Sequence, residues 1–211
     1  MFSKILSEKV ASFYEQHASD KKTLDVGSRS SRHKAHFPNS YSIDLSASND
    51  PDLVADAHAL PFQDNSYEIV ICREVLEHVK DPQKVLSELH RVLAPGGTLL
   101  LSTRFLFPVH EAPNDRWRFT RYILEELTTN FVEVTITEDT KPASTIGVLL
   151  QRFAWQSKFK FADKFFKFAL LVLAELFFRF DGFVDEQYGD ITKSYKVNSA
   201  FSSGFFLVAK K

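Results

Sequence analysis

The stretch Thr23-Leu24-Asp25-Val26-Gly27-Ser28-Arg29-Ser30-Ser31 decides how this chain is interpreted. β-Favouring residues surround an Asp-x-Gly, and the sequence then becomes small and polar, which is typical of a buried strand that ends in a tight turn. Gly27 can adopt backbone angles that are closed to other residues, or let a ligand come close. In open α/β sheets ligands bind at the carboxyl ends of the strands, so we expect this turn to form the floor of a binding site.

Segments of strand and helix character alternate along the rest of the chain. Further strands are predicted at 40–44, 53–56, 67–72, 98–102, 131–137 and 204–209. Helices are predicted in the opening segment 1–17, from Asp81-Pro82 until Pro95-Gly96-Gly97 ends the helix, and from Arg121 to Leu127 behind a Thr120 cap. This alternation predicts an α/β fold with a doubly wound, mostly parallel sheet.

Composition and charge narrow the class of protein. The chain has 211 residues and a net charge of −1, from 26 Lys+Arg against 27 Asp+Glu, which argues against a protein that binds nucleic acid. Cys72 is the single cysteine, so no intrachain disulfide is expected, and a reducing, cytoplasmic location fits. The first 17 residues lack the unbroken apolar run of a signal peptide.

Residues 139–200 are expected to form a helical, Phe-rich insertion between the sixth and seventh strands. Within it, 158–180 interleaves lysines with phenylalanines before a short apolar run. That run is far shorter than the ~20 residues that a membrane span requires. We favour a lid or a homodimer contact. The alternative is peripheral contact with the inner membrane surface, which would favour a lipid-linked or otherwise apolar acceptor.

An ordered series of short motifs carries a resemblance to a known family. The series resembles the class I S-adenosylmethionine-dependent methyltransferases, and more narrowly the type 11 group, over roughly residues 20 to 137. The segment from His110 to Thr120, with Asp115-Arg116-Trp117-Arg118-Phe119-Thr120, further resembles members often found in glycan or secondary-metabolite pathways. The motifs are Leu24-Asp25-Val26-Gly27, Asp44, Asp56-Ala57-x-x-Leu60-Pro61-Phe62, Cys72, Leu76-Glu77-His78 and Leu93-Ala94-Pro95-Gly96-Gly97.

The resemblance implies a Rossmann-like sheet of seven strands, the last one antiparallel, in a single domain spanning 1–211. It implies S-adenosyl-L-methionine as the cofactor, with the Asp44 carboxylate on the ribose hydroxyls and Asp56 on the adenine amino group. The turn after the first strand would face the methionine part. The implied cofactor-binding residues are Asp25, Gly27, Ser28, Asp44, Asp56, Ala57, Cys72 and Arg73.

Three residues are predicted to act on the acceptor. His110 and Asp115 lie in the loop after the fifth strand, where a base within hydrogen-bond reach of a hydroxyl or amine is useful, and His78 follows the fourth strand. Structural roles compete with each of these assignments: His78 as a histidine bonded to a nearby loop, and Asp115 in salt bridges that order its own loop. His33, His36 and Cys72 do not form a metal pattern, so no metal is expected.

We therefore expect a methyltransferase that moves a methyl group from S-adenosylmethionine to a small molecule by direct displacement, preferably to oxygen. Arg29 and Ser31 stand where family members usually carry glycine. This departure keeps open a second hypothesis, a non-catalytic protein of the same fold that acts as a partner- or membrane-binding module. A nicotinamide-dependent oxidoreductase is weaker, because Gly-x-Gly-x-x-Gly is missing after the first strand.

Overall fold

The computed structural model describes residues 5–28, 34–184, 186–197 and 199–211. They form two compact units, which are treated separately. One contains residues 13–104, 109–137 and 205–211, and it holds the sheet. The other contains residues up to 12, 105–108 and 138–204, and it holds the predicted insertion.

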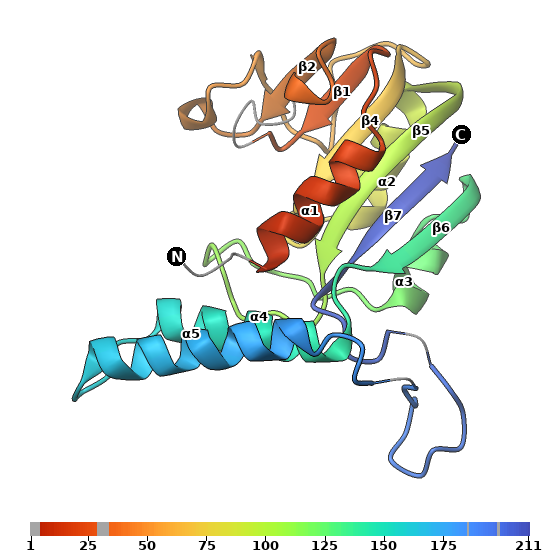
Figure 1. Ribbon diagram of the computed structural model, residues 1–211. Coiled ribbons are helices and arrows are strands. Elements are labelled where there is room, and N and C mark those ends of the chain that lie inside the picture. Colours follow the sequence, from red (N-terminus) through yellow and green to blue (C-terminus); the bar gives the residue numbers. More distant parts are fainter. Residues whose placement is uncertain (1–4, 29–33, 185, 198) are drawn as a thin grey trace. The chain divides into compact units, whose positions relative to one another are not determined.

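The sheet has seven strands in the order β3-β2-β1-β4-β5-β7-β6 (Figure 1). Strands β3, β2, β1, β4 and β5 pair in parallel, and β7 runs against them. The predicted fold class is thus confirmed, because this order reverses direction at β1 and ends on an antiparallel strand. The strand bounds are β1 Thr23–Val26, β2 Ser40–Asp44, β3 Leu53–Val54, β4 Tyr67–Arg73, β5 Leu93–Arg104, β6 Val132–Glu138 and β7 Gly204–Lys210.

Helices α1 (Ile5–Gln16), α2 (Pro82–Val92) and α3 (Arg121–Leu127) occupy the predicted segments. Helix α2 begins as its sequence indicates, since the Asp81 side chain accepts from the Lys84 amide at 3.0 Å and proline stands at the first turn. Its buried face contains Val85, Leu86, Leu89 and Val92. On another part of the sheet, the Phe13 ring near the end of α1 stacks on Phe206 of β7 at 4.4 Å.

Strand β5 begins earlier than predicted, at Leu93 rather than at residue 98. Helix α2 does end at Val92, as the Pro-Gly-Gly sequence indicates, but the chain becomes a strand at once. The Gly96 amide donates to the Lys211 carbonyl at 3.0 Å, and the Lys211 amide donates to Gly97 at 3.1 Å. These bonds to the other end of the chain extend the strand, and no local sequence signal announces them.

The second unit is built on two helices, α4 (Pro142–Gln156) and α5 (Asp163–Arg179), which lie side by side (Figure 1). They approach closely at Gly147, where a Cβ would lie 2.8 Å from the Ala174 carbonyl oxygen. Ala174 is the one fully buried residue of α5. Among the described helices, none combines the length and the apolar character needed to cross a membrane.

The two ends of the insertion meet at a buried carboxylate. Asp139 Oδ1 accepts from the Ser203 hydroxyl at 2.7 Å and from the Gly204 amide at 2.8 Å, and the hydroxyls of Thr140 and Ser202 reach the same oxygen at 3.1 Å. All of these residues are buried. An acceptor that is satisfied this fully in the interior fixes where the chain leaves β6 and where it enters β7.

Candidate active site

The turn after β1 has a conformation that only glycine adopts without strain. Gly27 has a φ of +74°, and a Cβ on it would lie 2.2 Å from Cγ2 of Val75. The amides of Gly27 and Ser28 both donate to the Ile43 carbonyl, at 2.8 and 3.3 Å. The glycine is therefore required by the backbone angle and by the closeness of the Val75 side chain.

The three predicted cofactor-binding carboxylates lie toward the carboxyl ends of adjacent strands: Asp25 is the next-to-last residue of β1, Asp44 is the last residue of β2 and Asp56 comes two residues after β3. Asp44 Oδ1 accepts from the Ser46 amide at 2.9 Å. Asp56 Oδ1 accepts from the His58 amide at 2.9 Å and lies 2.6 Å from His58 Nδ1. Within the described chain, the second oxygen of Asp44 and of Asp56 accepts no hydrogen bond, so each has an acceptor left for a ligand.

Asp25 is buried, with 4% of its surface exposed. Burial raises the pKa of Asp25 to about 7, while the nearby Arg73 guanidinium acts in the opposite direction and the Asp44 carboxylate adds to the rise. Tyr14 lies in the same environment. Burial raises the pKa of its phenol, while the Arg73 charge lowers that pKa and the Asp25 carboxylate adds to the rise. The carboxyl ends of β1, β2 and β4 thus share one cluster of coupled charges.

The remaining predicted cofactor residues differ in accessibility. The side chains of Ser28, Ala57 and Cys72 are buried, whereas Arg73 is half-buried. Burial also raises the pKa of the Cys72 thiol, so this cysteine stays protonated and belongs to the core. Arg29 and Ser31, on which the question of a closed site depends, lie outside the described residues.

Hydrogen bonds connect the loop after β5 to the segment that follows β4. The backbone amides of Arg116 and Trp117 both donate to the Glu77 carbonyl, at 2.8 and 3.1 Å. The Trp117 indole donates to the Val79 carbonyl at 2.9 Å, and the Phe119 amide donates to Arg104 at 2.9 Å. The bonds of Arg116 and Trp117 hold two segments that are more than 30 residues apart in sequence against each other, whereas the Phe119 bond joins the loop to the end of β5.

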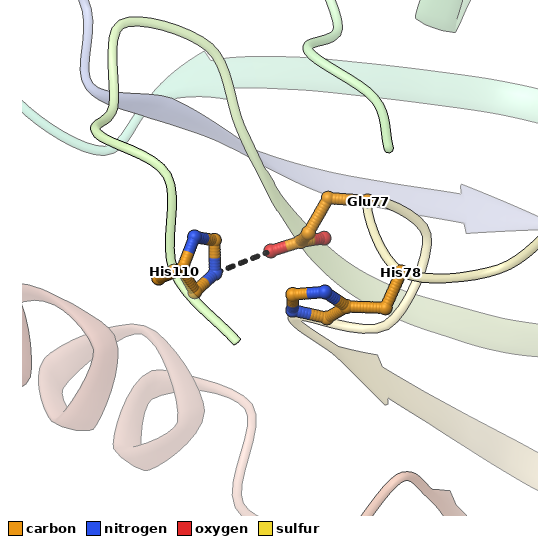
Figure 2. Close-up of side chains that lie close together, drawn as sticks. All are labelled: Glu77, His78 and His110. Carbon is orange, nitrogen blue, oxygen red and sulfur yellow. Dashed lines mark ion pairs between the residues drawn. The ribbon is translucent and has the colours of Figure 1, made fainter. Parts of the chain in front are cut away.

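This junction brings together Glu77, His78 and His110, each with a ligand-type atom within 4.8 Å of the others. Figure 2 shows the two imidazole rings beside the Glu77 carboxylate, with His110 Nε2 at 4.0 Å from Glu77 Oε1. The rings of His78 and His110 contact edge to face, 4.8 Å between centroids. Glu77 is completely buried, and its burial, together with the nearby Glu74 carboxylate, raises its pKa.

Asp115 holds its own loop in shape. It makes a two-pronged ion pair with Arg118, at 2.6 and 2.7 Å, and it accepts from the His110 backbone amide at 2.8 Å. The hydrogen bonds from Arg118 hold the pKa of Asp115 well below its usual range. Asp115 also lies 3.3 Å from His110 Nδ1, which suits a residue that orients the imidazole. The base role predicted for Asp115 stays a prediction.

Sequence reasoning placed His78, His110 and Asp115 in the site but left Glu77 out of it. The available signal was its position in Leu76-Glu77-His78, beside a histidine already chosen. Its complete burial, and the hydrogen bond that Oε2 accepts from Thr103 at 2.9 Å, depend on β5 and could not be derived locally.

Comparison with known proteins finds a family that matches the region from β1 into β5. Residues 24–101 match the family described as "Methyltransferase domain". On this match, the region from β1 into β5 resembles a class I methyltransferase domain. The match runs from β1 into β5, and it therefore includes the strand-end acids Asp25, Asp44 and Asp56 together with Glu77 and His78, but not His110.

Two curated relatives match over short regions. The "Ubiquinone/menaquinone biosynthesis C-methyltransferase UbiE" of Pseudoalteromonas translucida is 39% identical over 64 residues, which is 30% of this chain and 25% of that protein. The demethylmenaquinone methyltransferase of Renibacterium salmoninarum is 46% identical over 54 residues, which is 25% of this chain and 23% of that protein. The chain thus matches about a quarter of the length of these relatives.

Solved structures agree on the fold over nearly the whole chain. A methyltransferase from Thermotoga maritima, described as a possible histamine N-methyltransferase, gives a TM-score of 0.59 at 13% identity and covers 98% of this chain and 91% of that one. Phosphoethanolamine N-methyltransferase 2 of Haemonchus contortus, solved with S-adenosyl-L-methionine, gives 0.59 at 18% identity and covers 97% and 52%. At these identities the likeness concerns the fold alone.

Proposed function

We propose that this protein transfers a methyl group from S-adenosyl-L-methionine to a small organic acceptor by direct displacement. The observation that carries the proposal is the match of residues 24–101 to the methyltransferase domain family. That region contains the three carboxylates at adjacent strand ends, at the edge where open α/β sheets bind their ligands.

The cofactor is proposed to lie across the ends of β1 and β2. Oδ1 of Asp44 and of Asp56 is used by the hydrogen bond within its own turn, so Oδ2 of each is the proposed acceptor. Asp44 Oδ2 accepts from the ribose hydroxyls, and Asp56 Oδ2 accepts from the adenine amino group beside Ala57. The turn at Gly27 and Ser28 faces the methionine part. Asp25, which precedes that turn, is partly protonated, and Arg73 at the end of β4 is a positive charge that acts on it.

The acceptor is proposed to lie against Glu77, His78 and His110, with Asp115 holding His110 in place. The sulfonium of the cofactor is already an excellent leaving group, so the protein has to align the two substrates and exclude water. A hydroxyl must also lose its proton as the new bond forms. A cluster of two imidazoles and a carboxylate suits that task, and we therefore propose oxygen as the acceptor atom.

Thermal unfolding with added ligands tests the proposal. S-adenosylmethionine or S-adenosylhomocysteine at ~100 times its dissociation constant would stabilise the fold by ~2.7 kcal/mol, a rise of several degrees in Tm. NAD serves as the control nucleotide. A rise with the methionine nucleosides alone supports the proposal, and a rise with NAD alone, or with none of the three, contradicts it.

One observation favours a second function, a non-catalytic protein that binds a partner or a membrane surface. Helix α5 leaves most of its apolar side chains exposed, among them Phe165 at 67% and Phe168 at 59%. Lysines 158, 160, 164 and 167 accompany them, an arrangement that suits an anionic lipid surface. Co-sedimentation with anionic and with neutral vesicles tests this function. Vesicle binding without any response to S-adenosylmethionine would replace the first proposal by the second.

A further inference from the structure

Three side chains with atoms that can bind a metal ion lie close together where the loop after β4 meets the loop after β5. The donors of Glu77, His78 and His110 all lie within 4.8 Å of one another (Figure 2). Glu77 and His78 follow β4, whereas His110 belongs to the loop after β5. The bonds from Arg116 and Trp117 to the Glu77 carbonyl hold these two segments together. The cluster therefore belongs to well-connected backbone rather than to freely moving side chains.

Both imidazoles have an oxygen close to Nδ1, which is hydrogen-bonded in His78 and only a charge contact in His110. His78 Nδ1 lies 3.2 Å from the Asn114 carbonyl oxygen. A carbonyl can only accept, so this contact requires the proton on Nδ1 and leaves the lone pair on Nε2. His110 Nδ1 lies 3.3 Å from the Asp115 carboxylate, a charge contact that favours a proton on Nδ1 although it lacks hydrogen-bond geometry. In metal-binding histidines the second ring nitrogen is bonded to a carbonyl or carboxylate, as it is in His78, and Asp115 is placed to do the same for His110.

Glu77 supplies a buried oxygen that the described protein leaves unsatisfied. Its Oε2 accepts from the Thr103 hydroxyl at 2.9 Å, whereas Oε1 accepts no hydrogen bond and points toward His110 Nε2, 4.0 Å away. The residue is fully buried. A buried oxygen without a hydrogen bond is costly, and His110 Nε2, at 4.0 Å, is too far away to provide one. A cation between the two residues would give Glu77 Oε1 the partner it lacks.

We propose that Glu77, His78 and His110 bind a divalent first-row transition-metal ion, such as Zn²⁺. Imidazole nitrogens favour such ions over Mg²⁺ or Ca²⁺, and two histidines with one glutamate are an established zinc donor set. Donors ~2.1 Å from a tetrahedral ion lie roughly 3.4 Å apart, so the side chains draw in by about 1 Å on binding. Three protein ligands leave a coordination position open.

The open position gives the site a further use, and this step rests on the proposed function. An acceptor hydroxyl that binds the ion there has a lower pKa, because the cation stabilises the oxyanion, so its proton passes to solvent water and the ion takes over the role given above to the three side chains as a base. The proposed substrate class then narrows to acceptors with a metal-coordinating oxygen, such as a hydroxyl beside a carbonyl or a second hydroxyl.

Metal titration of the full chain tests the site without any methyl transfer. Calorimetry with Zn²⁺, and visible absorption with Co²⁺, should show one ion per chain. Glu77→Gln and His78→Ala should each weaken Zn²⁺ binding on the order of 100-fold or more, and Asp115→Asn about 10- to 100-fold, as is typical when a residue behind a ligand is lost. Glu77→Gln keeps an oxygen for Thr103, and His78 is only half-buried, so both variants should fold. Circular dichroism checks this.

His58→Gln is the matched control, because His58 also sits beside a carboxylate, Asp56, but lacks a third donor. Its Zn²⁺ affinity should equal that of the wild type. The proposal is overturned if the wild type binds no ion, or if Glu77→Gln and His78→Ala bind as well as the wild type does. The thermal response to S-adenosylmethionine, measured on the same samples, is a separate readout, so failure of the metal site and failure of the proposed function are distinguishable.

Discussion

The sheet of this protein buries most of its apolar residues, whereas helix α5 leaves most of its apolar side chains exposed. Every residue of β1 is buried, and Val70, Ile71 and Cys72 of β4 are completely buried. Helix α5 is equally rich in apolar residues, yet Ala174 alone is buried along its 17 residues. The two regions lie in different compact units of the same chain.

This difference in burial indicates that the sheet stabilises the fold and that the exposed face of α5 is available to contact other molecules. Burial of apolar surface is the main favourable contribution to folding, so the sheet provides most of the free energy of unfolding. The exposed face of α5 adds little to that free energy, and a contiguous exposed apolar surface often marks an interaction site. Substitutions in the two regions should therefore differ in their consequences, and the following predictions run from the largest expected effect to the smallest.

Truncating a core side chain of the sheet should have the largest effect. Ile71→Ala removes a fully buried side chain from the centre of β4 and should lower the free energy of unfolding by about 4 kcal/mol, through lost burial and a residual cavity. Urea denaturation followed by circular dichroism measures this. A loss below about 1 kcal/mol would contradict the assignment of stability to the sheet.

Gly27→Ala should be the next most harmful change. It places a Cβ on a residue with φ +74° and 2.2 Å from a methyl carbon of Val75. The strained backbone and the overlap together should cost about 2 to 3 kcal/mol. Gly182→Ala, where nothing lies within 4 Å and no positive φ is found, is the matched control and should change stability little. Equal effects of the two substitutions would contradict the account of the turn after β1.

Asp25 should make the sheet unit less stable as the pH rises. Its pKa of about 7, raised by burial above the ordinary value near 3.8, means that the folded state holds the proton more tightly than the unfolded state does. The free energy of unfolding therefore falls between about pH 4 and 7, as Asp25 ionises among Arg73, Asp44, Tyr14 and Cys72.

Asp25→Asn cannot ionise and should be more stable than the wild type at about pH 8 by on the order of 1 to 3 kcal/mol, with the advantage lost near pH 4. Denaturation curves across this range measure the difference. Asp20→Asn, an exposed carboxylate before β1, should follow the wild-type profile. A variant advantage that does not change with pH would show that Asp25 is not the titrating group.

The smallest effect on stability is expected on α5. Phe168→Ser alters a side chain that is 59% exposed and should change the free energy of unfolding by less than about 0.5 kcal/mol. A loss comparable to that of Ile71→Ala would show that α5 is packed against something in solution. The same variant in vesicle co-sedimentation then reports whether lipid is what it contacts.

The sequence predicted most elements because their signals are local. Strand β2 and helix α3 have the expected bounds, and α2 begins at its Asp81 cap. The early start of β5 was not predictable, since it depends on bonds between Gly96, Gly97 and the distant Lys211.

The same limit applies to the candidate site. The acids at the ends of β1, β2 and β3 were found because a strand-end position is visible in sequence. His78 and His110 were each placed in the site, but their contact with Glu77 was not found, because the two segments are more than 30 positions apart and meet through tertiary hydrogen bonds such as those of Arg116 and Trp117 to Glu77. Spacing rules for metal ligands do not detect such a non-local set.

Calorimetric titration with S-adenosylhomocysteine tests the central claim most directly, on the wild type, on Asp44→Ala and on Asp20→Ala as the matched carboxylate control at the other end of β1. The account predicts that the wild type and Asp20→Ala bind equally. Asp44→Ala should bind on the order of 10- to 100-fold more weakly, because it loses charge-assisted hydrogen bonds to the ribose. Unchanged affinity in Asp44→Ala, or no binding by the wild type, would contradict it.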